Sequence, residues 1–344
     1  MPAWEQESIL RGEVRCGRPL EFLFLVSFDS DFAAVEAEPD ERQGREPLVI
    51  VGPTASGKSS LAVALARRIG GAEIVSADAM AVYRGMDIGT AKPTLAERAG
   101  VVHHLIDVVE PKEEYTVARF QQDVAEAVAG IGERGAVPIV VGGTGLYVRA
   151  VVDNFTMPGQ YPKLRDIIEQ EASTERLWQH LNSLDPEAAS KMLPSNRRRI
   201  VRALEVTLGS GRPFSSYGPG VDRYPKSSFR QVGLRLDRDV LDTRINARYD
   251  HQVQSGFLAE VARLRASGLS RTAGQALGYR ELLAHLDGEW ELDEAIEEAK
   301  KRTRRFARRQ ERWFRRDPRI TWFEALDPEL VDRVAEWWSK PLDD

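Results

Sequence analysis

One segment of the chain, Gly52-Pro53-Thr54-Ala55-Ser56-Gly57-Lys58-Ser59, has the residue types and spacing of a phosphate-binding loop. Apolar residues 48–51 precede it, and residues 59–69 with helical apolar spacing follow it, which is the strand–loop–helix context that this motif needs. The glycines let backbone N–H groups turn toward phosphate oxygens, while Lys58 and the helix N-terminus add positive charge. The Ser59 hydroxyl is suited to Mg²⁺, so the sequence predicts a site for a di- or triphosphate with magnesium as cofactor.

Two other polar residues follow apolar runs that we interpret as parallel strands. Asp78 comes after residues 74–77, and Thr144 comes after residues 138–141 and two glycines. Ligands of open parallel sheets bind at the carboxyl ends of the strands, so we expect Asp78 and Thr144 to face the crevice that holds the phosphate loop.

A kinase or ATPase would add a carboxylate at the end of a strand to hold Mg²⁺. The strand at residues 138–141 ends without an acid, and Asp107 is the best substitute, so a kinase stays an alternative. The pair His103-His104 lacks a third ligand at metal-binding spacing, which favours capping or packing.

Basic side chains cluster in two places. Arg198, Arg199 and Arg202 share one side of a predicted helix, and residues 300–316 carry ten bases and one acid, with aromatic residues between them. In the second cluster, Arg304 and Arg308 lie on one side of the predicted helix. Ten bases and one acid are too unequal for salt bridges between residues one turn apart to neutralise the bases. We therefore expect the cluster to bind an RNA backbone.

The order of these segments predicts an α/β fold, a P-loop-containing parallel-sheet core with a helical insertion domain and a helical C-terminal region. Residues 47–154 alternate strands and helices, residues 155–228 are helical and polar, and residues 229–344 return to the core before several amphipathic helices. We expect residues 1–46 to be a poorly ordered extension.

Composition limits the class of protein. The chain has 344 residues and a net charge of −5, but residues 1–46 alone hold 11 acidic and 5 basic side chains, so the rest is near neutral. The single cysteine, Cys16, excludes an internal disulfide and a cysteine-rich zinc site. The apolar run at residues 22–28 is too short to span a bilayer. We expect a cytoplasmic monomer without a membrane partner.

Several motifs together resemble the tRNA dimethylallyltransferase (tRNA isopentenyltransferase) family, and they extend from about residue 47 to residue 325. Besides the phosphate loop, the resemblance is carried by segments at 76–78, 82–93, 141–147, 202–206, 278–280 and 308–310, the most distinctive being Gly85-Met86-Asp87-Ile88-Gly89-Thr90-Ala91-Lys92-Pro93. The resemblance implies transfer of a dimethylallyl group from dimethylallyl diphosphate to N6 of the adenosine at tRNA position 37, next to the anticodon, with release of diphosphate.

The resemblance also implies roles for individual residues. Asp78 would be the general base, Thr144 an active-site threonine, and Arg248 or Arg244 a diphosphate contact, with Arg248 favoured. Residues 155–228 would clamp the anticodon stem-loop of the tRNA. The implied tRNA contacts are Asp78, Ala79, Met80, Ala81, Arg165, Arg198, Arg199, Ile200, Val201, Arg202, Gln275, Ala276, Leu277, Gly278, Tyr279, Arg280, Arg304 and Arg308.

The chain departs from the family pattern at Ala79 and Ala81, where the family often has serine and glutamine, so polar contacts to RNA are expected to change there. Three alternatives stay open beside the tRNA enzyme. They are an adenylate isopentenyltransferase, a P-loop kinase or ATPase that acts on RNA, and a non-catalytic RNA-binding protein.

Overall fold

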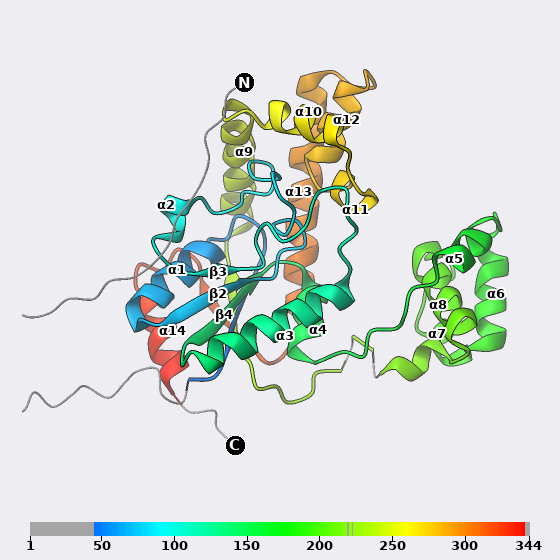
Figure 1. Cartoon of the computed structure of the whole chain (residues 1–344), viewed down its shortest axis with the longest axis horizontal. Coiled ribbons are helices and arrows are strands. Elements are labelled where there is room, and N and C mark those ends of the chain that lie inside the picture. Colours follow the sequence, from blue (N-terminus) through cyan, green and yellow to red (C-terminus); the bar gives the residue numbers. More distant parts are fainter. Residues whose placement is uncertain (1–44, 219, 222, 341–344) are drawn as a thin grey trace, which may run out of the picture. The chain divides into compact units, whose positions relative to one another are not determined.

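The computed structural model describes residues 45–340 apart from 219 and 222, and within these residues the strands form one six-stranded parallel sheet (Figure 1). The strand order is β3-β2-β4-β1-β5-β6. The strands are β1 (Leu48–Val51), β2 (Ala72–Ser76), β3 (His103–His104), β4 (Val137–Gly142), β5 (Arg230–Arg235) and β6 (Ile320–Glu324). The strand before the phosphate loop, β1, is central, because Leu48 pairs with Ile139 of β4 on one side and Arg230 of β5 on the other.

Helices connect and cover these strands. The first group is α1 (Lys58–Ile69), α2 (Leu95–Arg98), α3 (Val117–Glu133), α4 (Gly145–Val152), α5 (Pro162–Glu169), α6 (Thr174–Leu184), α7 (Pro186–Ser190) and α8 (Arg197–Ser210), followed by a 3-10 turn at Phe214–Tyr217. The second group is α9 (Arg238–Gln254), α10 (Phe257–Ser267), α11 (Arg271–Gly274), α12 (Tyr279–Leu286), α13 (Leu292–Phe314) and α14 (Leu330–Ser339). Polar side chains cap several N-termini, as where the Thr116 hydroxyl accepts a hydrogen bond from the Arg119 N–H at the start of α3.

Both faces of the sheet are buried, as is usual for parallel strands. Leu48 and Ile50 point to a cluster that contains α1 and α14, whereas Val49 and Val51 point to the opposite cluster, built from α3, α4 and the helices α9 to α13. This alternation along β1 places helices on both sides of the strand and leaves its carboxyl end for the phosphate loop.

The predicted fold class is confirmed. The strands β1, β2 and β4 and the helix after the phosphate loop lie within two residues of their predicted ranges. The short β3, β6 and α14 were not predicted, because β3 spans only two residues and β6 is flanked by charged and turn residues.

The predicted N-terminal extension, with Cys16, falls almost wholly outside the described residues. Of its positions, Arg45 and Glu46 are described, and both lie against α14. The Glu46 carbonyl accepts a hydrogen bond from the Trp338 indole N–H at 2.9 Å, and an Arg45 guanidinium N–H donates to the Ala335 carbonyl at 3.4 Å.

The helices α5 to α8 lie together as one group (Figure 1), and their buried side chains form an apolar cluster of their own. The cluster includes Leu181, Ile200 and Leu204, which are fully buried. The return from this segment toward β5 is held by Arg149, which donates to the carbonyls of Val221 and Arg223 at 2.9 and 2.6 Å. Over the described part of the chain, no helix combines the length and apolarity needed to cross a membrane.

Candidate active site at the carboxyl ends of β1, β2 and β4

The predicted phosphate loop curls between β1 and α1 and is closely packed. A side chain at Gly52 would lie 2.8 Å from the Leu234 carbonyl oxygen of β5, and Gly57 has a φ of +91°, so both positions favour glycine. The Ser56 hydroxyl is buried and has no hydrogen-bond partner among the described residues. A buried hydroxyl in such a loop fits an oxygen-rich ligand.

Lys58 lies at the start of α1 and turns back toward the loop, where its ammonium donates to the Pro53 carbonyl at 2.7 Å. Desolvation of the ammonium lowers the pKa of Lys58 to about 8. The nearby Asp78 carboxylate opposes this shift, and the Arg248 guanidinium adds to it. The interaction with Asp78 places that carboxylate within electrostatic reach of the loop.

Asp78 follows β2, and its carboxylate accepts a hydrogen bond from the Met80 N–H at 2.8 Å. It lines a cavity of about 60 Å³ together with Ser59 of the loop and with Thr90 and Lys92. The residue before Asp78 is fixed to the sheet, because the Ala77 N–H donates to the Val141 carbonyl of β4 at 2.7 Å. The expected juxtaposition of Asp78 with the phosphate loop is therefore found.

Arg248 and Arg244 project from α9 onto the loop. Arg248 donates to the Thr54 hydroxyl at 2.8 Å, and Arg244 donates to the Ala55 carbonyl at 3.4 Å. Burial lowers the pKa of Arg248, and its Nε has no partner in the described structure. Both candidate arginines reach the loop, and Arg248 is the more buried of the two.

Thr144 occupies the N-cap position of α4, but its side chain makes no hydrogen bond to the first turn of the helix. The residue before it, Gly143, accepts a hydrogen bond from the Gln310 side chain of α13 at 2.8 Å. The same amide accepts the Thr54 N–H at 2.9 Å. Gln310 thus joins the loop after β4 to the phosphate loop, a contact that sequence reasoning missed.

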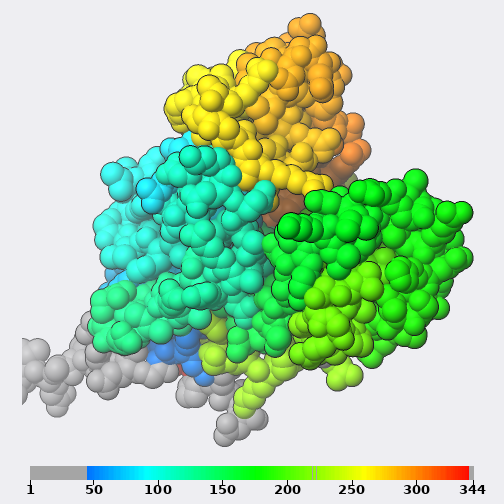
Figure 2. Space-filling view, turned by 45° about the vertical axis from the view of Figure 1, so that its right-hand side comes forward, coloured from blue at the N-terminus to red at the C-terminus, as the bar shows by residue number. Residues whose placement is uncertain are grey.

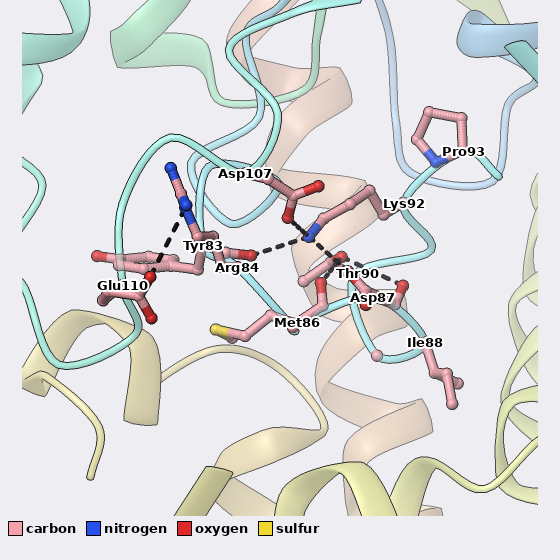
Figure 3. Close-up of polar contacts among 12 residues, drawn as sticks. Tyr83, Arg84, Met86, Asp87, Ile88, Thr90, Lys92, Pro93, Asp107 and Glu110 are labelled. Atoms are coloured by element: carbon pink, nitrogen blue, oxygen red, sulfur yellow. Dashed lines mark hydrogen bonds and ion pairs between the residues drawn. The ribbon is translucent and has the colours of Figure 1, made fainter. Parts of the chain in front are cut away.

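The distinctive segment at residues 85–93 forms one wall of the cavity and is tied together by Lys92 (Figure 3). The buried ammonium donates to the Tyr83 carbonyl at 2.8 Å and to the carboxylates of Asp87 and Asp107, each at 2.6 Å. Asp107 therefore serves this ion pair, which weakens its assignment as a kinase metal ligand.

A second set of contacts, from α10 and α12, holds residues 87–89 of the same segment. The Glu260 carboxylate of α10 accepts the N–H groups of Asp87, Ile88 and Gly89 at 2.9–3.1 Å, and the Tyr279 hydroxyl at 2.6 Å. In Figure 2 the yellow and orange residues of α10 and α12 lie above the cyan part of the chain.

Replacing Gly89 by alanine should destabilise the protein by about 1–3 kcal/mol, because an added Cβ would lie 2.1 Å from the Phe257 ring and 2.5 Å from the Tyr279 ring. Urea unfolding measures the change. Gly132→Ala in α3 is the matched control, because nothing lies within 4 Å of its Cβ. An equal midpoint for Gly89→Ala and the unsubstituted protein would contradict this packing.

Some of the predicted tRNA contacts are exposed, and others are buried. Within the described ranges, Arg198 and Arg199 are exposed and form no ion pair, while Arg165 and Arg202 pair with Glu169 and Glu205 at 2.9 and 2.8 Å. Gln275 and Arg280 are exposed, Leu277 is half-buried, and Gly278 is the N-cap residue of α12. Ala79 and Met80 are half-buried.

Five of these residues are corrected as side-chain contacts to RNA. Ile200 and Val201 are buried in the cluster of α5 to α8, Ala276 is buried, and Ala81 lines the small cavity beside Asp78. Tyr279 is fully buried, with its hydroxyl on Glu260. The polar and exposed residues beside them in each motif concealed this burial.

The basic cluster at residues 300–316 lies on α13, and its expected lack of acidic partners was wrong in part. Lys300 pairs with Asp250 of α9 at 2.8 Å, Arg302 with Glu281 of α12 at 2.6 Å, and Arg308 with Asp242 of α9 at 3.3 Å. Arg304 donates to the Asn246 side chain at 2.5 Å. These partners lie on other helices, which a count along one helix does not include. Further acidic partners lie on α13 itself, where Glu297, Glu298 and Glu311 pair with bases of the cluster.

A groove of about 490 Å³ nevertheless keeps a basic lining between α9 and α13. Its arginines are Arg238, Arg305, Arg308, Arg309 and Arg312, against the acids Asp242 and Glu311. Among the described residues, Arg305 and Arg312 form no ion pair. The groove suits a polyanion.

The adjacent histidines His103 and His104 both form contacts that stabilise the fold. His104 contacts the Glu73 carboxylate at 2.6 Å, and His103 contacts the Val101 carbonyl at 2.9 Å. No group of three or more His, Cys, Asp or Glu side chains that could hold a metal occurs in the part of the chain described.

Comparison with known proteins places this site in a family. The family model described as IPP transferase matches residues 81–317, and the one described as isopentenyl transferase matches residues 46–109. The tRNA dimethylallyltransferase of Bifidobacterium longum is 50% identical over 292 residues, covering 83% of this chain and 88% of that protein. The tRNA dimethylallyltransferase of Nocardioides sp. is 48% identical over 305 residues, covering 87% and 98%.

Solved structures agree. The tRNA isopentenylpyrophosphate transferase of Bacillus halodurans is 39% identical, with a TM-score of 0.63, over 85% of this chain and 95% of that one. A eukaryotic dimethylallyltransferase that acts on tRNA is 29% identical, with a TM-score of 0.69, over 85% and 77% of the two chains. This chain belongs to the tRNA dimethylallyltransferase (IPP transferase) family and is an enzyme of that type.

Proposed function

We propose that this enzyme transfers the dimethylallyl group of dimethylallyl diphosphate to N6 of the adenosine at tRNA position 37. The allylic C–O bond breaks, diphosphate leaves with the bonding electrons, and the N6–C bond forms. The amine then gives up one proton. The observation that carries the proposal is the shared cavity, which Ser59 of the phosphate loop and Asp78 line together.

The loop suits a departing diphosphate. Its buried Ser56 hydroxyl lacks a protein partner among the described residues, and Lys58 and Arg248 add positive charge beside the loop. Such preorganised donors stabilise the negative charge that grows on the leaving group.

The Ser59 hydroxyl lines the cavity beside Asp78 and fits Mg²⁺, which prefers oxygen ligands and usually binds together with substrate phosphates. Ser59 would hold the ion there with the diphosphate. When bound, it would neutralise charge on the leaving diphosphate.

Asp78 is the proposed general base. Its carboxylate has one hydrogen bond, from the Met80 N–H, and lies in the electrostatic field of Lys58 and Arg248. A carboxylate within hydrogen-bond reach of N6 accepts the proton that alkylation releases. Thr144, whose hydroxyl makes no capping bond, is proposed to orient the substrate.

The RNA is proposed to bind as an anticodon stem-loop. Its target adenine has to leave the stack to enter the site. The exposed Arg198 and Arg199 of α8 and the arginine-lined groove of α13 supply positive charge for the RNA backbone.

One incubation tests the proposal. Purified protein is mixed with unmodified tRNA, Mg²⁺ and dimethylallyl diphosphate labelled in the allyl group, and ATP hydrolysis is followed in parallel. Label in the tRNA, recovered as an N6-alkylated adenosine next to the anticodon, is the expected result. Label on free adenine nucleotides, or ATP turnover without labelled tRNA, would contradict it.

Substitution of the groove arginines should weaken tRNA binding in a salt-dependent way. For Arg305→Gln combined with Arg312→Gln, we expect the plot of log affinity against log salt to become shallower by about 1–2, because each lost phosphate contact removes about 0.7–0.9 from the slope. Fluorescence anisotropy of labelled tRNA over a salt series measures this slope. Arg333→Gln on α14, whose arginine pairs with Asp327, is the control. Equal slopes for all three proteins would exclude the groove as an RNA contact.

A further inference from the structure

Gln310 lies on α13 within the basic run but does not share its environment. Gln310 is 6% exposed, whereas its neighbour Arg309 is exposed and Glu311 is partly exposed. It belongs to the buried stripe of the helix, one turn before Phe314 and one turn after Ala307. An uncharged amide at this depth normally has its hydrogen-bonding capacity satisfied.

Both ends of that amide bond to loops of the active site. The carbonyl oxygen accepts the Thr54 N–H of the phosphate loop at 2.9 Å, and the amide nitrogen donates to the Gly143 carbonyl at 2.8 Å. The two loops follow β1 and β4, which are neighbours in the sheet. A single side chain thus fixes the spacing between the phosphate loop and the turn that leads to Thr144.

The surroundings leave little freedom for this contact. A Cβ at Gly143 would lie 2.3 Å from the Gln310 nitrogen, and a Cβ at Gly145 would lie 2.3 Å from the Trp313 ring. The next turn of α13 therefore packs against the start of α4 as closely as Gln310 packs against the loop. Thr54 is held a second time by its hydroxyl, which accepts from Arg248 at 2.8 Å.

The Thr54 N–H is also removed from the set that can bind phosphate. Because it points to Gln310, the amides available to a diphosphate are those further along the loop, toward α1.

We propose that Gln310 is a positioning residue that couples the basic helix α13 to the diphosphate cradle and to the Thr144 turn. This inference rests on the proposed function of the cradle. Gln310 does not touch the substrate. It sets the loop geometry in which the allylic diphosphate is bound and cleaved, and positioning errors of this kind reduce rates strongly.

The test uses Gln310→Met, which keeps the length of the side chain and removes both hydrogen bonds. We expect the KM for dimethylallyl diphosphate to rise about tenfold and kcat to fall about tenfold, because two buried hydrogen bonds to the loops are lost. The KM for tRNA should stay within about twofold, since the residue faces away from the groove arginines. Gln310→Asn, which is one methylene shorter and cannot reach both partners, carries the same expectation if the methionine variant fails to fold.

Thr303→Val is the matched control. Thr303 is buried on the same helix, and its hydroxyl bonds to the Tyr249 hydroxyl at 2.9 Å, away from both loops. Its KM for dimethylallyl diphosphate should equal that of the unsubstituted enzyme. A double-mutant cycle with Thr54→Val, which loses the Arg248 contact, should show a coupling of at least about threefold, because both contacts hold the same loop residue.

The outcomes separate the inference from the proposed function. If the unsubstituted enzyme binds no diphosphate, the cradle is wrong and the inference falls with it. If it binds diphosphate and both Gln310 variants keep the same kinetic constants for the donor, only the inference is overturned. Equal loss of donor and tRNA affinity would also overturn it, because it would indicate a general structural role.

Discussion

Replacing Asp78 by asparagine or alanine is expected to lower turnover by about 10²–10⁴-fold, while tRNA affinity stays within a few fold. The carboxylate lies in the cavity beside the phosphate loop, and the reaction needs an acceptor for the N6 proton. Its removal leaves the cradle, Lys58 and the RNA-binding surfaces in place. Single-turnover transfer with enzyme in excess measures the chemical step, and filter binding measures tRNA affinity.

Glu324→Gln is the control for this substitution. Glu324 ends β6, at the same edge of the sheet, and its exposed carboxylate pairs with Arg235. We expect its transfer rate to match that of the unsubstituted enzyme. A rate for Asp78→Asn that equals the control would exclude Asp78 as the general base.

Replacing Lys58 by methionine should lower kcat by about 10²–10³-fold and weaken diphosphate binding, because one charged donor to the leaving group is lost. The lysine also predicts a pH dependence. Its pKa lies near 8 in the ligand-free enzyme, so its ammonium is charged below that pH and loses its proton above it. Affinity for a diphosphate ester should therefore fall as the pH rises from 8 to 10.

Calorimetry with a non-reactive thio analogue of the donor measures this dependence. The last ionisation of such an ester is expected at about 6, as for phosphate monoesters, so its charge is constant over the range. Lys58→Met should bind weakly and equally at pH 7.5 and 9.5. A wild-type affinity that does not change between these values would contradict the placement of Lys58 beside the diphosphate.

The sheet core could be predicted because its signals are local. The strand before the loop, the Gly52–Ser59 motif and the helix after it are contiguous, and each predicts the next. The short β3 was missed because a two-residue strand has no period of its own, and its pairing with Ile74 and Val75 depends on the tertiary fold. The helix α14 was missed because its buried face includes Trp338 and Val334 among many charges.

From the residues alone, the site could be predicted only where the type of a residue and its position beside a strand or loop indicate its chemical role. Lys58 was found from the phosphate-loop motif and Asp78 from its place after a predicted strand, whereas Arg244 and Arg248 were implied only by the family resemblance. In the structure all four lie at or near the loop.

The contacts that position these groups could not be predicted. Gln310 and Glu260 join segments that are far apart in sequence, with separations of 256 residues for Gln310 and Thr54 and 173 for Glu260 and Asp87. Lys92 joins nearer residues, up to 15 positions away, but across turns that have no regular pattern in the sequence. For Gln310, one signal was available. It is the uncharged polar residue at a position of α13 that shares a side with Trp313, within a run of arginines.

The distance between the Asp78 carboxylate and the target adenine tests the central claim most directly. It can be measured in a crystal structure of the enzyme with Mg²⁺, an anticodon stem-loop and the thio analogue of dimethylallyl diphosphate. We predict that the diphosphate lies on the amides at residues 56–59 and that N6 lies about 2.6–3.2 Å from an Asp78 oxygen. An adenine whose N6 lies beyond reach of Asp78, with the diphosphate bound away from that loop, would contradict the proposed reaction.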